Sequence, residues 1–219
     1  MKNMILENSD RYFCGRCISI GDDIYNRIIN KSYRVNDDIS LSDLRYVQVM
    51  YYDYNHDIQR GEIIVNKDIL DDTLFIFKEL FRNEYELYSV RLVDDLWAGD
   101  PLTTDEASMR ANNSSCFNYR KIAGKTYLSK HATGHAIDIN PYENPYVRFD
   151  EDGKPICDGM SDEEIYYINN RNIGVSHVIT HEDLAYKLFS ECGFEWGGDW
   201  NPPMEPLDYQ HFEKILIKK

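Results

Sequence analysis

The sequence predicts an α+β domain, in which a small and mainly antiparallel sheet carries helices packed on one side. Two kinds of pattern support this fold class. Short runs rich in β-branched and aromatic residues, of which 44–52 is the clearest, are typical of strands. Two longer runs, 68–82 and 181–192, repeat their apolar residues at the spacing of an amphipathic helix. The length of 219 residues fits one large domain, or one domain with an N-terminal appendage.

The N-terminal third begins with a polar segment. Residues 1–43 are rich in Asn, Asp and Ser and contain only short apolar patches. We therefore expect a loosely packed arm in front of a domain that spans 44–219. That domain opens with the strand 44–52, and 61–66 is interpreted as a second short strand. The helix 68–82 follows, with acidic residues in its first turns.

The middle of the chain combines short strands with long irregular stretches. Residues 87–93 are interpreted as one strand and 136–140 as another, which Pro141 ends. Between them, 94–125 contains many small and polar residues. It is interpreted as a long active-site loop, since loops of that length in compact domains tend to be functional. Residues 150–180 are interpreted as an insertion with turn signals.

The C-terminal part completes the predicted sheet. The helix 181–192 is followed by Gly193, a residue type that commonly ends helices. Residues 194–200 are expected to turn sharply through two glycines, and 209–217 are expected to form the closing strand.

The formal net charge of −14 limits the classes of partner. An acidic surface repels phosphate backbones, so we expect no binding to nucleic acid and no attraction to anionic membranes. No run of about 18 apolar residues is present, so the sequence predicts no integral membrane segment. The opening residues 1–10 are too short and too acidic for a secretory signal, which leaves the localisation open.

The five cysteines cannot all pair with one another, because their number is odd. This favours a reducing site of synthesis over a disulfide framework. Cys14 and Cys17 form a single C-x-x-C motif, for which three interpretations stay open: incidental thiols, a disulfide or redox pair, or a metal site.

Two segments far apart in the chain contain residues that suit a metal site. The segment 129–138 contributes His131 and Asp138, and a second segment contributes His211, with Asp208 three residues before it. Two imidazoles and one carboxylate form the ligand set of a catalytic zinc site, whose fourth position stays open for water or substrate. A spare carboxylate beside a metal-acidified water would complete the groups needed for hydrolysis.

The local sequence indicates how His131 and Asp138 converge. Gly134 and the strand-like residues after it argue against one continuous helix that would carry both side chains. A turn through Thr133 and Gly134 that leads into a strand would direct both toward one point. On that strand Asp138 alternates with Ile137, so it faces away from the apolar side.

The motifs of both segments resemble those of a known family. The chain is similar to the D-alanyl-D-alanine carboxypeptidase and L-alanyl-D-glutamate endopeptidase family of zinc peptidases, which act on the peptide stems of bacterial peptidoglycan. The similarity covers roughly residues 44–215 and implies the fold of that family, which the hedgehog signalling domain shares. It rests on three motifs in order: Ser129-x-His131-x-x-Gly134-x-Ala136-x-Asp138, Trp196-Gly-Gly-Asp-Trp200, and Asp208-Tyr-Gln-His211-Phe. The likeness extends upstream to 61–66, 108–109 and 112–120.

The resemblance implies one zinc ion per chain, with His131, Asp138 and His211 as its ligands. It makes Asp208 the general base, at a position where many members have Glu. Arg120 matches a basic residue of the family that faces the scissile carbonyl or a substrate carboxylate. We therefore expect Arg120 to serve catalysis and substrate binding, with a surface salt bridge as the other interpretation.

Other residues of these motifs are expected near the substrate. Ser129 would hold the ligand loop or contact substrate, unless it is an ordinary turn hydroxyl. Trp196 and Trp200 would shape the cleft wall and contact substrate, with core packing as the alternative. They would also orient His211, together with Asp199. His135 is interpreted as a rim residue and not as a ligand.

The sequence thus predicts a zinc metallopeptidase that cleaves a D-amino-acid-containing bond in peptidoglycan stem peptides or muropeptides, as a monomer. D-Ala-D-Ala carboxypeptidase and L-Ala-D-Glu endopeptidase activity both fit. The alternative is a catalytically idle, zinc-containing binding or signalling module of the same fold. The expected substrate lies in the cell wall, so we expect either a lysin released through a pore or an enzyme of cytoplasmic muropeptide recycling.

Overall fold

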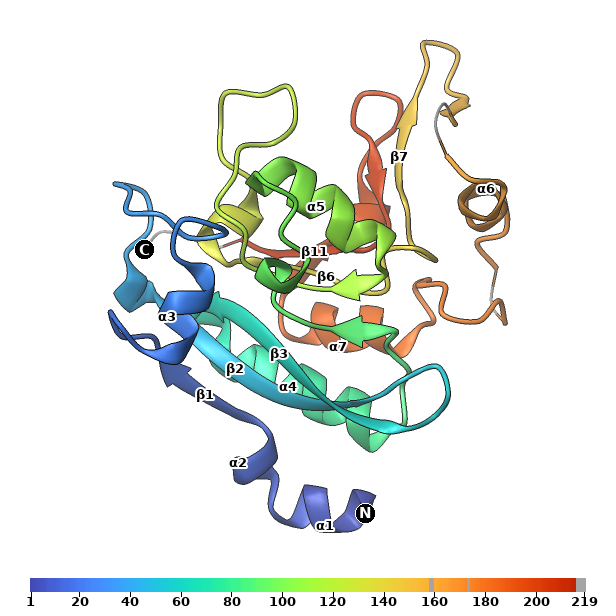
Figure 1. Cartoon of the computed structure of the whole chain (residues 1–219). Helices are drawn as coiled ribbons and strands as arrows, with labels where there is room; N and C mark the ends of the chain where they lie inside the picture. Colours follow the sequence, from blue (N-terminus) through green and yellow to red (C-terminus); the bar gives the residue numbers. More distant parts are fainter. Residues whose placement is uncertain (158–159, 173, 216–219) are drawn as a thin grey trace.

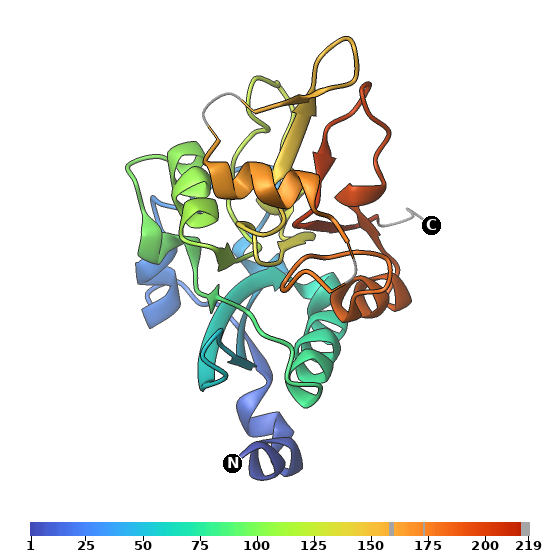
Figure 2. The same cartoon turned by 90° about the vertical axis from the view of Figure 1, so that its right-hand side faces the viewer.

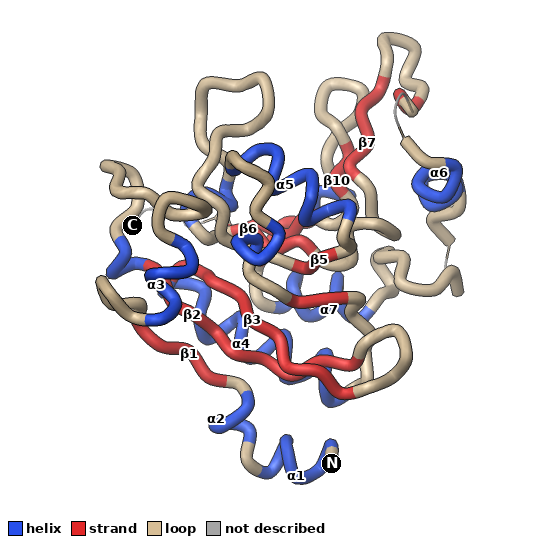
Figure 3. Tube along the Cα trace, viewed as in Figure 1, coloured by secondary structure: helices blue, strands red, loops and turns tan. Residues whose placement is uncertain are grey.

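The computed structural model describes residues 1–157, 160–172 and 174–215 (Figure 1). Its helices and strands confirm the predicted α+β class (Figure 3). The helices are α1 (Lys2–Glu7), α2 (Ser9–Tyr12), α3 (Asp23–Ile28), α4 (Leu70–Arg82), α5 (Pro101–Arg110), α6 (Asp162–Asn169) and α7 (Leu184–Glu191). The strands are β1 (Cys14–Cys17), β2 (Leu44–Tyr52), β3 (Ile58–Asn66), β4 (Ser89–Val90), β5 (Asn113–Ser114), β6 (Ala136–Asp138), β7 (Tyr146–Phe149), β8 (Pro155–Ile156), β9 (Phe194–Trp196), β10 (Leu207–Asp208) and β11 (His211–Lys214).

The strands form several small sheets. One antiparallel sheet has the order β1-β2-β3, and a second has the order β6-β11-β9. A third runs β10-β7-β8, and β4 pairs with β5 in parallel. The second sheet positions the candidate site, because it pairs the segment around residue 138 with the segment around residue 211.

The hairpin of β2 and β3 forms the long sheet of the domain. Its register runs from Leu44 opposite Asn66 to Tyr52 opposite Ile58, so β3 begins three residues before the predicted Gly61. One face of this sheet carries α4, and α7 lies beside α4, as Figure 2 shows. The strand predicted at 44–52 and the helices predicted at 68–82 and 181–192 are therefore present, as β2, α4 and α7.

The main hydrophobic core joins the β1-β2-β3 sheet and the β6-β11-β9 sheet to α4 and α7. Side chains from each element are buried together, which removes their apolar surface from water and stabilises the fold. Its members include Ile63 and Val65 of β3, Ile76 and Phe77 of α4, Phe189 of α7 and Phe212 of β11. The rings of Phe189 and Phe212 stack with centroids 4.2 Å apart, so α7 packs directly on the strand that carries His211.

The predicted loop 94–125 is wrong in part, because it contains α5. This helix starts at a strong signal: the Asp100 side chain accepts hydrogen bonds from the backbone N–H groups of Leu102 and Thr103, and Pro101 occupies the first turn. Its residues are mostly small or polar, so no apolar stripe marked it as a helix.

Other boundaries also differ from the prediction. The strand expected at 87–93 is reduced to β4, because Val93–Leu96 forms a 3₁₀ turn. The insertion 150–180 contains β8 and α6, and α6 begins with a capping box. The closing strand expected at 209–217 is β11, and the last two of those residues lie outside the described part of the chain.

The N-terminal segment 1–43, expected to form a loosely packed arm, contributes a strand and buried side chains. Its β1 pairs with β2 at the edge of the long sheet. Its α3 buries Ile24 and Ile28 in a second hydrophobic cluster, which also contains Phe117 and Ala132 from the middle of the chain. A domain boundary at residue 44 stays a prediction.

A buried hydrogen-bonded pair fastens this segment to the rest of the chain. The carboxylate of Asp94 accepts a hydrogen bond of 3.0 Å from the backbone N–H of Ser32 and one of 2.8 Å from the Ser32 hydroxyl. Both residues are almost fully buried. Removal of the segment would therefore leave Asp94 without these donors.

We predict that a chain truncated to begin at residue 44 does not fold cooperatively. The truncation uncovers the second cluster, and each large apolar side chain in it contributes ~1.5–3 kcal/mol. A few such losses approach the ~5–15 kcal/mol that stabilises a typical domain. Thermal unfolding followed by circular dichroism measures the effect. Deletion of α1 alone, which removes the one buried residue Ile5, is the milder control. A truncated chain with an unchanged melting temperature would contradict the prediction.

None of the helices in the described residues combines the length and the apolar character required to cross a bilayer. The five cysteines are all free, and both Cys14 and Cys17 are exposed on β1. Side chains three positions apart on a strand point to opposite faces. The strand conformation of β1 therefore does not bring these two thiols together.

Candidate metal centre

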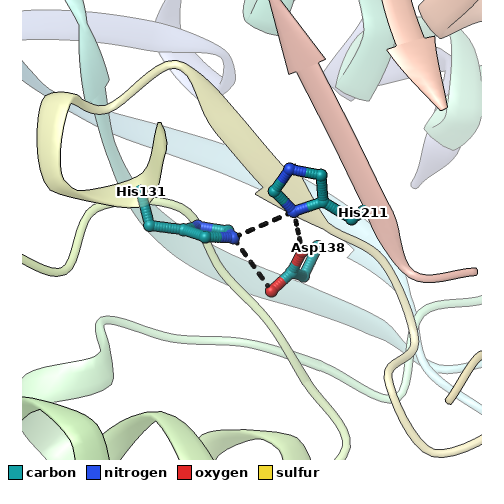
Figure 4. A group of neighbouring side chains, drawn as sticks. All are labelled: His131, Asp138 and His211. Carbon is teal, nitrogen blue, oxygen red and sulfur yellow. Dashed lines mark hydrogen bonds and ion pairs between the residues drawn. The ribbon is translucent and has the colours of Figure 1, made fainter. Parts of the chain in front are cut away.

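Three predicted residues meet at one point (Figure 4). His211 begins β11 and lies directly opposite Asp138 at the end of β6, so the antiparallel register brings these two side chains together. His131 comes from the 3₁₀ turn Lys130–Thr133 that precedes β6. All three are buried, and they form the one group of metal-ligating side chains found within residues 1–157, 160–172 and 174–215.

The turn before β6 has the conformation that the motif predicted. The Ser129 hydroxyl accepts a hydrogen bond from the backbone N–H of His131, which starts the turn. Gly134 ends it in the left-handed conformation, with φ of +70°. Two hydrogen bonds from Asn66, to the carbonyls of Thr133 and Gly134, hold the turn against the end of β3.

We predict that Gly134→Ala destabilises the protein by about 2–4 kcal/mol, through left-handed strain and overpacking together. A Cβ atom at Gly134 would lie 2.7 Å from the backbone nitrogen of Asn66, which cannot swing aside. Gly124→Ala is the matched control, because Gly124 has φ of +71° but no atom within 4 Å of its added Cβ. Denaturant unfolding of both variants measures the difference. Equal losses would show that the turn does not pack as described.

The distances within the centre suit a tetrahedral zinc ion. His131 Nε2 lies 3.2 Å from His211 Nδ1 and 3.3 Å from Asp138 Oδ2, and His211 Nδ1 lies 3.2 Å from Asp138 Oδ1. Zinc ligands at bond lengths of ~2.0–2.1 Å in a tetrahedron stand ~3.3 Å apart. The two imidazole nitrogens therefore have the spacing of two corners of a zinc site, and with one oxygen of Asp138 the three donor atoms lie within 4.8 Å of one another.

The outer nitrogens of both imidazoles are engaged, which selects the inner ones as ligands. His131 Nδ1 lies 2.6 Å from the backbone carbonyl oxygen of Cys116, so it donates its proton there and presents Nε2 to the centre. His211 Nε2 lies 3.1 Å from Glu213 Oε2, which leaves Nδ1 for the centre. Metal-binding histidines commonly have such partners, which fix the ring and the tautomer. The residues thus fit a zinc ion.

The electrostatics of the centre favour a cation. Burial opposes the charge on Asp138, but the two imidazoles hold the pKa of its carboxyl well below the usual range. Burial likewise favours a neutral His211, yet its hydrogen bonds to Asp138 and Glu213 raise its pKa to about 10. A metal ion competes with this proton for Nδ1, so metal affinity falls as pH falls.

Asp208 lies beside the centre, at the end of β10. Burial raises the pKa of its carboxyl to about 6, with the charge of Asp138 adding to the rise and that of His211 opposing it. The side-chain amide of Gln210 donates a 3.1 Å hydrogen bond to Asp208 Oδ1 and fixes one oxygen. Gly197 lies against Asp208, since an added Cβ would be 2.5 Å from the Asp208 carbonyl oxygen. A carboxyl with a pKa close to neutrality can both accept and return a proton.

Arg120 is held by a partner that the sequence did not reveal. Its Nη2 lies 2.7 Å from Asp105 Oδ2, and the two side chains are only 13% and 16% exposed, so this is not a surface salt bridge. Burial raises the pKa of Asp105, and the charges of Arg120 and His131 oppose that rise. Asp105 was missed because it lies on α5, in a segment interpreted as a loop.

The remaining predicted residues lie in two environments. The ring of Trp200 lies 5.5 Å from that of His211, at the edge of the centre. Trp196 is 5% exposed, belongs to the main core and donates to the Tyr209 carbonyl, which supports the packing interpretation. His135 lies outside the ligand group, as expected.

The partner of His211 is not the one that the sequence suggested. The Asp199 carboxylate contacts His181 at 2.6 Å. Glu213 makes the contact to the His211 ring that was expected of Asp199. Glu213 follows His211 by two positions on β11, so both face the same side of the strand. That spacing is the signal that could have revealed it.

Comparison with known families supports this assignment. Residues 123–214 match the family model described as D-alanyl-D-alanine carboxypeptidase. No curated protein and no solved structure gives a significant match. The matched segment includes the three ligands and Asp208, and it begins after Arg120 and Asp105. The resemblance read from the motifs is therefore confirmed over residues 123–214: the segment that carries the His-Asp-His centre matches the model of the D-alanyl-D-alanine carboxypeptidase family.

Proposed function

We propose that the protein is a zinc-dependent peptidase that hydrolyses a D-amino-acid-containing bond in peptidoglycan stem peptides. One observation carries the proposal: His131, Asp138 and His211 bring three donor atoms within 4.8 Å of one another, inside the segment that matches the peptidase family. Asp208 lies beside them as a carboxyl that is not a ligand. This is the equipment of a hydrolase of the metallopeptidase type.

His131, Asp138 and His211 would hold the zinc ion. When bound, zinc lowers the pKa of a water molecule toward about 7 and polarises a carbonyl group. Ser129 keeps the turn that carries His131 in place, and Glu213 keeps the His211 ring oriented. These two contacts preserve the geometry of the ligands while substrate enters.

Asp208 acts as the general base and then as the general acid. At neutral pH its carboxyl is mostly ionised, so one oxygen accepts the proton of the attacking water as the water adds to the scissile carbonyl. The hydrogen bond from Gln210 occupies Oδ1 and leaves Oδ2 for this transfer. The same carboxyl then returns the proton to the nitrogen of the departing amine, which breaks the C–N bond.

Arg120 stabilises the negative charge that develops on the carbonyl oxygen. Its planar guanidinium offers several N–H donors in a fixed geometry. The ion pair with Asp105 holds the group in position before substrate binds, so no reorganisation is needed during the reaction. Trp200, at the edge of the centre beside His211, forms the wall against which the peptide lies.

Product analysis tests the proposal. The zinc-loaded protein is incubated with a panel of muropeptides, and the products are followed by mass spectrometry. We expect cleavage at one bond, D-Ala-D-Ala or L-Ala-D-Glu, that stops when zinc is removed by a chelator. A protein with one zinc ion per chain that cleaves none of the stems would instead be the catalytically idle binding module.

A further inference from the structure

The ion pair of Arg120 and Asp105 changes what the candidate active site can recognise. Arg120 Nη2 and Asp105 Oδ2 lie 2.7 Å apart, and both side chains are largely buried. The two residues come from different elements: Asp105 from α5, and Arg120 from the segment after β5. Arg120 Nε is also buried and has no hydrogen-bond partner among the described residues. Arg120 Nη1 lies 3.4 Å from the backbone carbonyl oxygen of Lys121, so it is the outer nitrogens of the guanidinium that make these contacts.

A guanidinium alone and a guanidinium paired with a carboxylate select different ligands. Alone, it complements a carboxylate, which accepts two parallel N–H bonds. Paired with Asp105, the guanidinium keeps its charge and free N–H donors, but the Asp105 oxygens beside it are acceptors that repel a second carboxylate. A primary carboxamide or a peptide group has one acceptor and one donor. Such a group fits the pair, because its oxygen can accept from an Arg120 N–H and its N–H can donate to an Asp105 oxygen.

The surrounding charges act in the same direction. Asp138, Asp208 and Glu213 add three more carboxyl groups around the centre. The whole chain carries a formal net charge of −14. Bound zinc and Arg120 offset part of this charge, and the remaining excess of carboxylates lowers the local concentration of anionic ligands. An anionic peptide is therefore disfavoured both on approach and at the Arg120 position.

The D-Ala-D-Ala and L-Ala-D-Glu bonds have a comparable group next to the scissile nitrogen, and the Asp105–Arg120 pair can distinguish its charged form from its uncharged form. In a D-Ala-D-Ala terminus, the carbon after the scissile nitrogen carries a free carboxylate. In an L-Ala-D-Glu linkage that continues through the side-chain carboxyl of Glu, the same carbon carries the α-carboxyl, either free or as an amide. A substrate can thus present a charged or an uncharged group at the same distance from the scissile bond.

We propose that the Asp105–Arg120 pair selects peptides in which this group is an uncharged amide and rejects those in which it is a free carboxylate. The proposal rests on the proposed peptidase function and specifies its substrate class. Asp105 acts as a specificity-determining residue through Arg120, and the preferred substrate is an amidated or internal stem segment and not a free C-terminus.

The test uses two synthetic stem peptides that differ only in this group, one with a carboxylate and one with a carboxamide. For the zinc-loaded protein we expect kcat/KM to be at least about tenfold higher for the carboxamide, as one unfavourable like-charge contact would give. Asp105→Asn keeps the shape and an acceptor for Arg120 but removes the charge, so the preference should vanish or reverse. Asp105→Glu keeps the charge and should keep the preference.

A binding measurement separates this proposal from the peptidase assignment. Asp208→Ala, loaded with zinc, is titrated with both peptides by calorimetry, with and without Asp105→Asn. The carboxamide should bind more tightly only when Asp105 is present, whether or not the wild-type protein cleaves either peptide. If Asp105→Asn does not fold, the wild-type preference should shrink as salt rises, because salt screens charge repulsion.

Two results would overturn the proposal. One is a wild-type protein that treats the two peptides equally or prefers the carboxylate peptide. The other is a preference for the amide that Asp105→Asn and high salt both leave unchanged. Failure to cleave either peptide, with the binding preference intact, would instead reject the proposed function alone.

Discussion

Asp208→Asn is expected to lower kcat by about 10²–10⁴-fold while zinc remains bound, because the amide cannot accept the proton of the attacking water. The substitution keeps the shape of the side chain and the possibility of a hydrogen bond with Gln210. It therefore removes the chemistry with little change in packing. Single-turnover kinetics with a stem peptide, together with zinc analysis of the same sample, measures both quantities.

Asp208→Glu is the matched control for this prediction. It restores a carboxylate, at a position where many members of the family have Glu, and should recover most of the activity. Gly197 lies against the backbone and Cβ of Asp208, so the substitution keeps this contact and lengthens the side chain by one methylene group. Unchanged kcat in Asp208→Asn would remove Asp208 from the mechanism, and zinc loss in that variant would make it a structural residue instead.

His131→Ala is expected to abolish zinc binding at micromolar metal and to reduce activity to background. It removes one of three ligands. The loss of zinc affinity must therefore exceed about 10–100-fold, the loss typical when a residue that hydrogen-bonds a ligand is changed. Glu213→Gln is the matched comparison, because Glu213 contacts only the outer nitrogen of His211. Its effect should lie within that smaller range. Competition with a chromogenic chelator measures both affinities.

Zinc should also stabilise the wild-type protein. A ligand that binds only the folded state at 1,000 times its Kd contributes about 4 kcal/mol to stability. Chelation should therefore lower the melting temperature of the wild type and leave that of His131→Ala unchanged. Retention of one zinc ion per chain by His131→Ala would show that the ion binds elsewhere.

The strongest periodic patterns predicted the elements of the main core. Residues 44–52 and 68–82 carry a dense apolar repeat, because one face of each is buried against the other. The helix α5 buries only Thr104 and Ser108, so its sequence has no such repeat and was interpreted as a loop. The N-terminal segment was interpreted as loose for a similar reason, because its few isoleucines are dispersed among polar residues.

The ligands of the candidate site could be predicted, and their supporting residues could not. His131, Asp138 and His211 have residue types and flanking motifs that point to a metal. Asp105 and Glu213 are ordinary acids in the sequence, and their meaning depends on Arg120 and His211 lying beside them in the fold. Pairing between residues distant in the chain is a property of tertiary packing, which a single sequence does not display.

The most direct test of this account is X-ray absorption at the zinc edge, on protein loaded with one equivalent of zinc. The account predicts a first shell made only of nitrogen and oxygen at ~2.0–2.1 Å, with the outer-shell scattering of two imidazoles. A shell that contains sulfur at ~2.3 Å would place the ion on cysteines such as Cys14 and Cys17, and would contradict the His131, Asp138 and His211 centre.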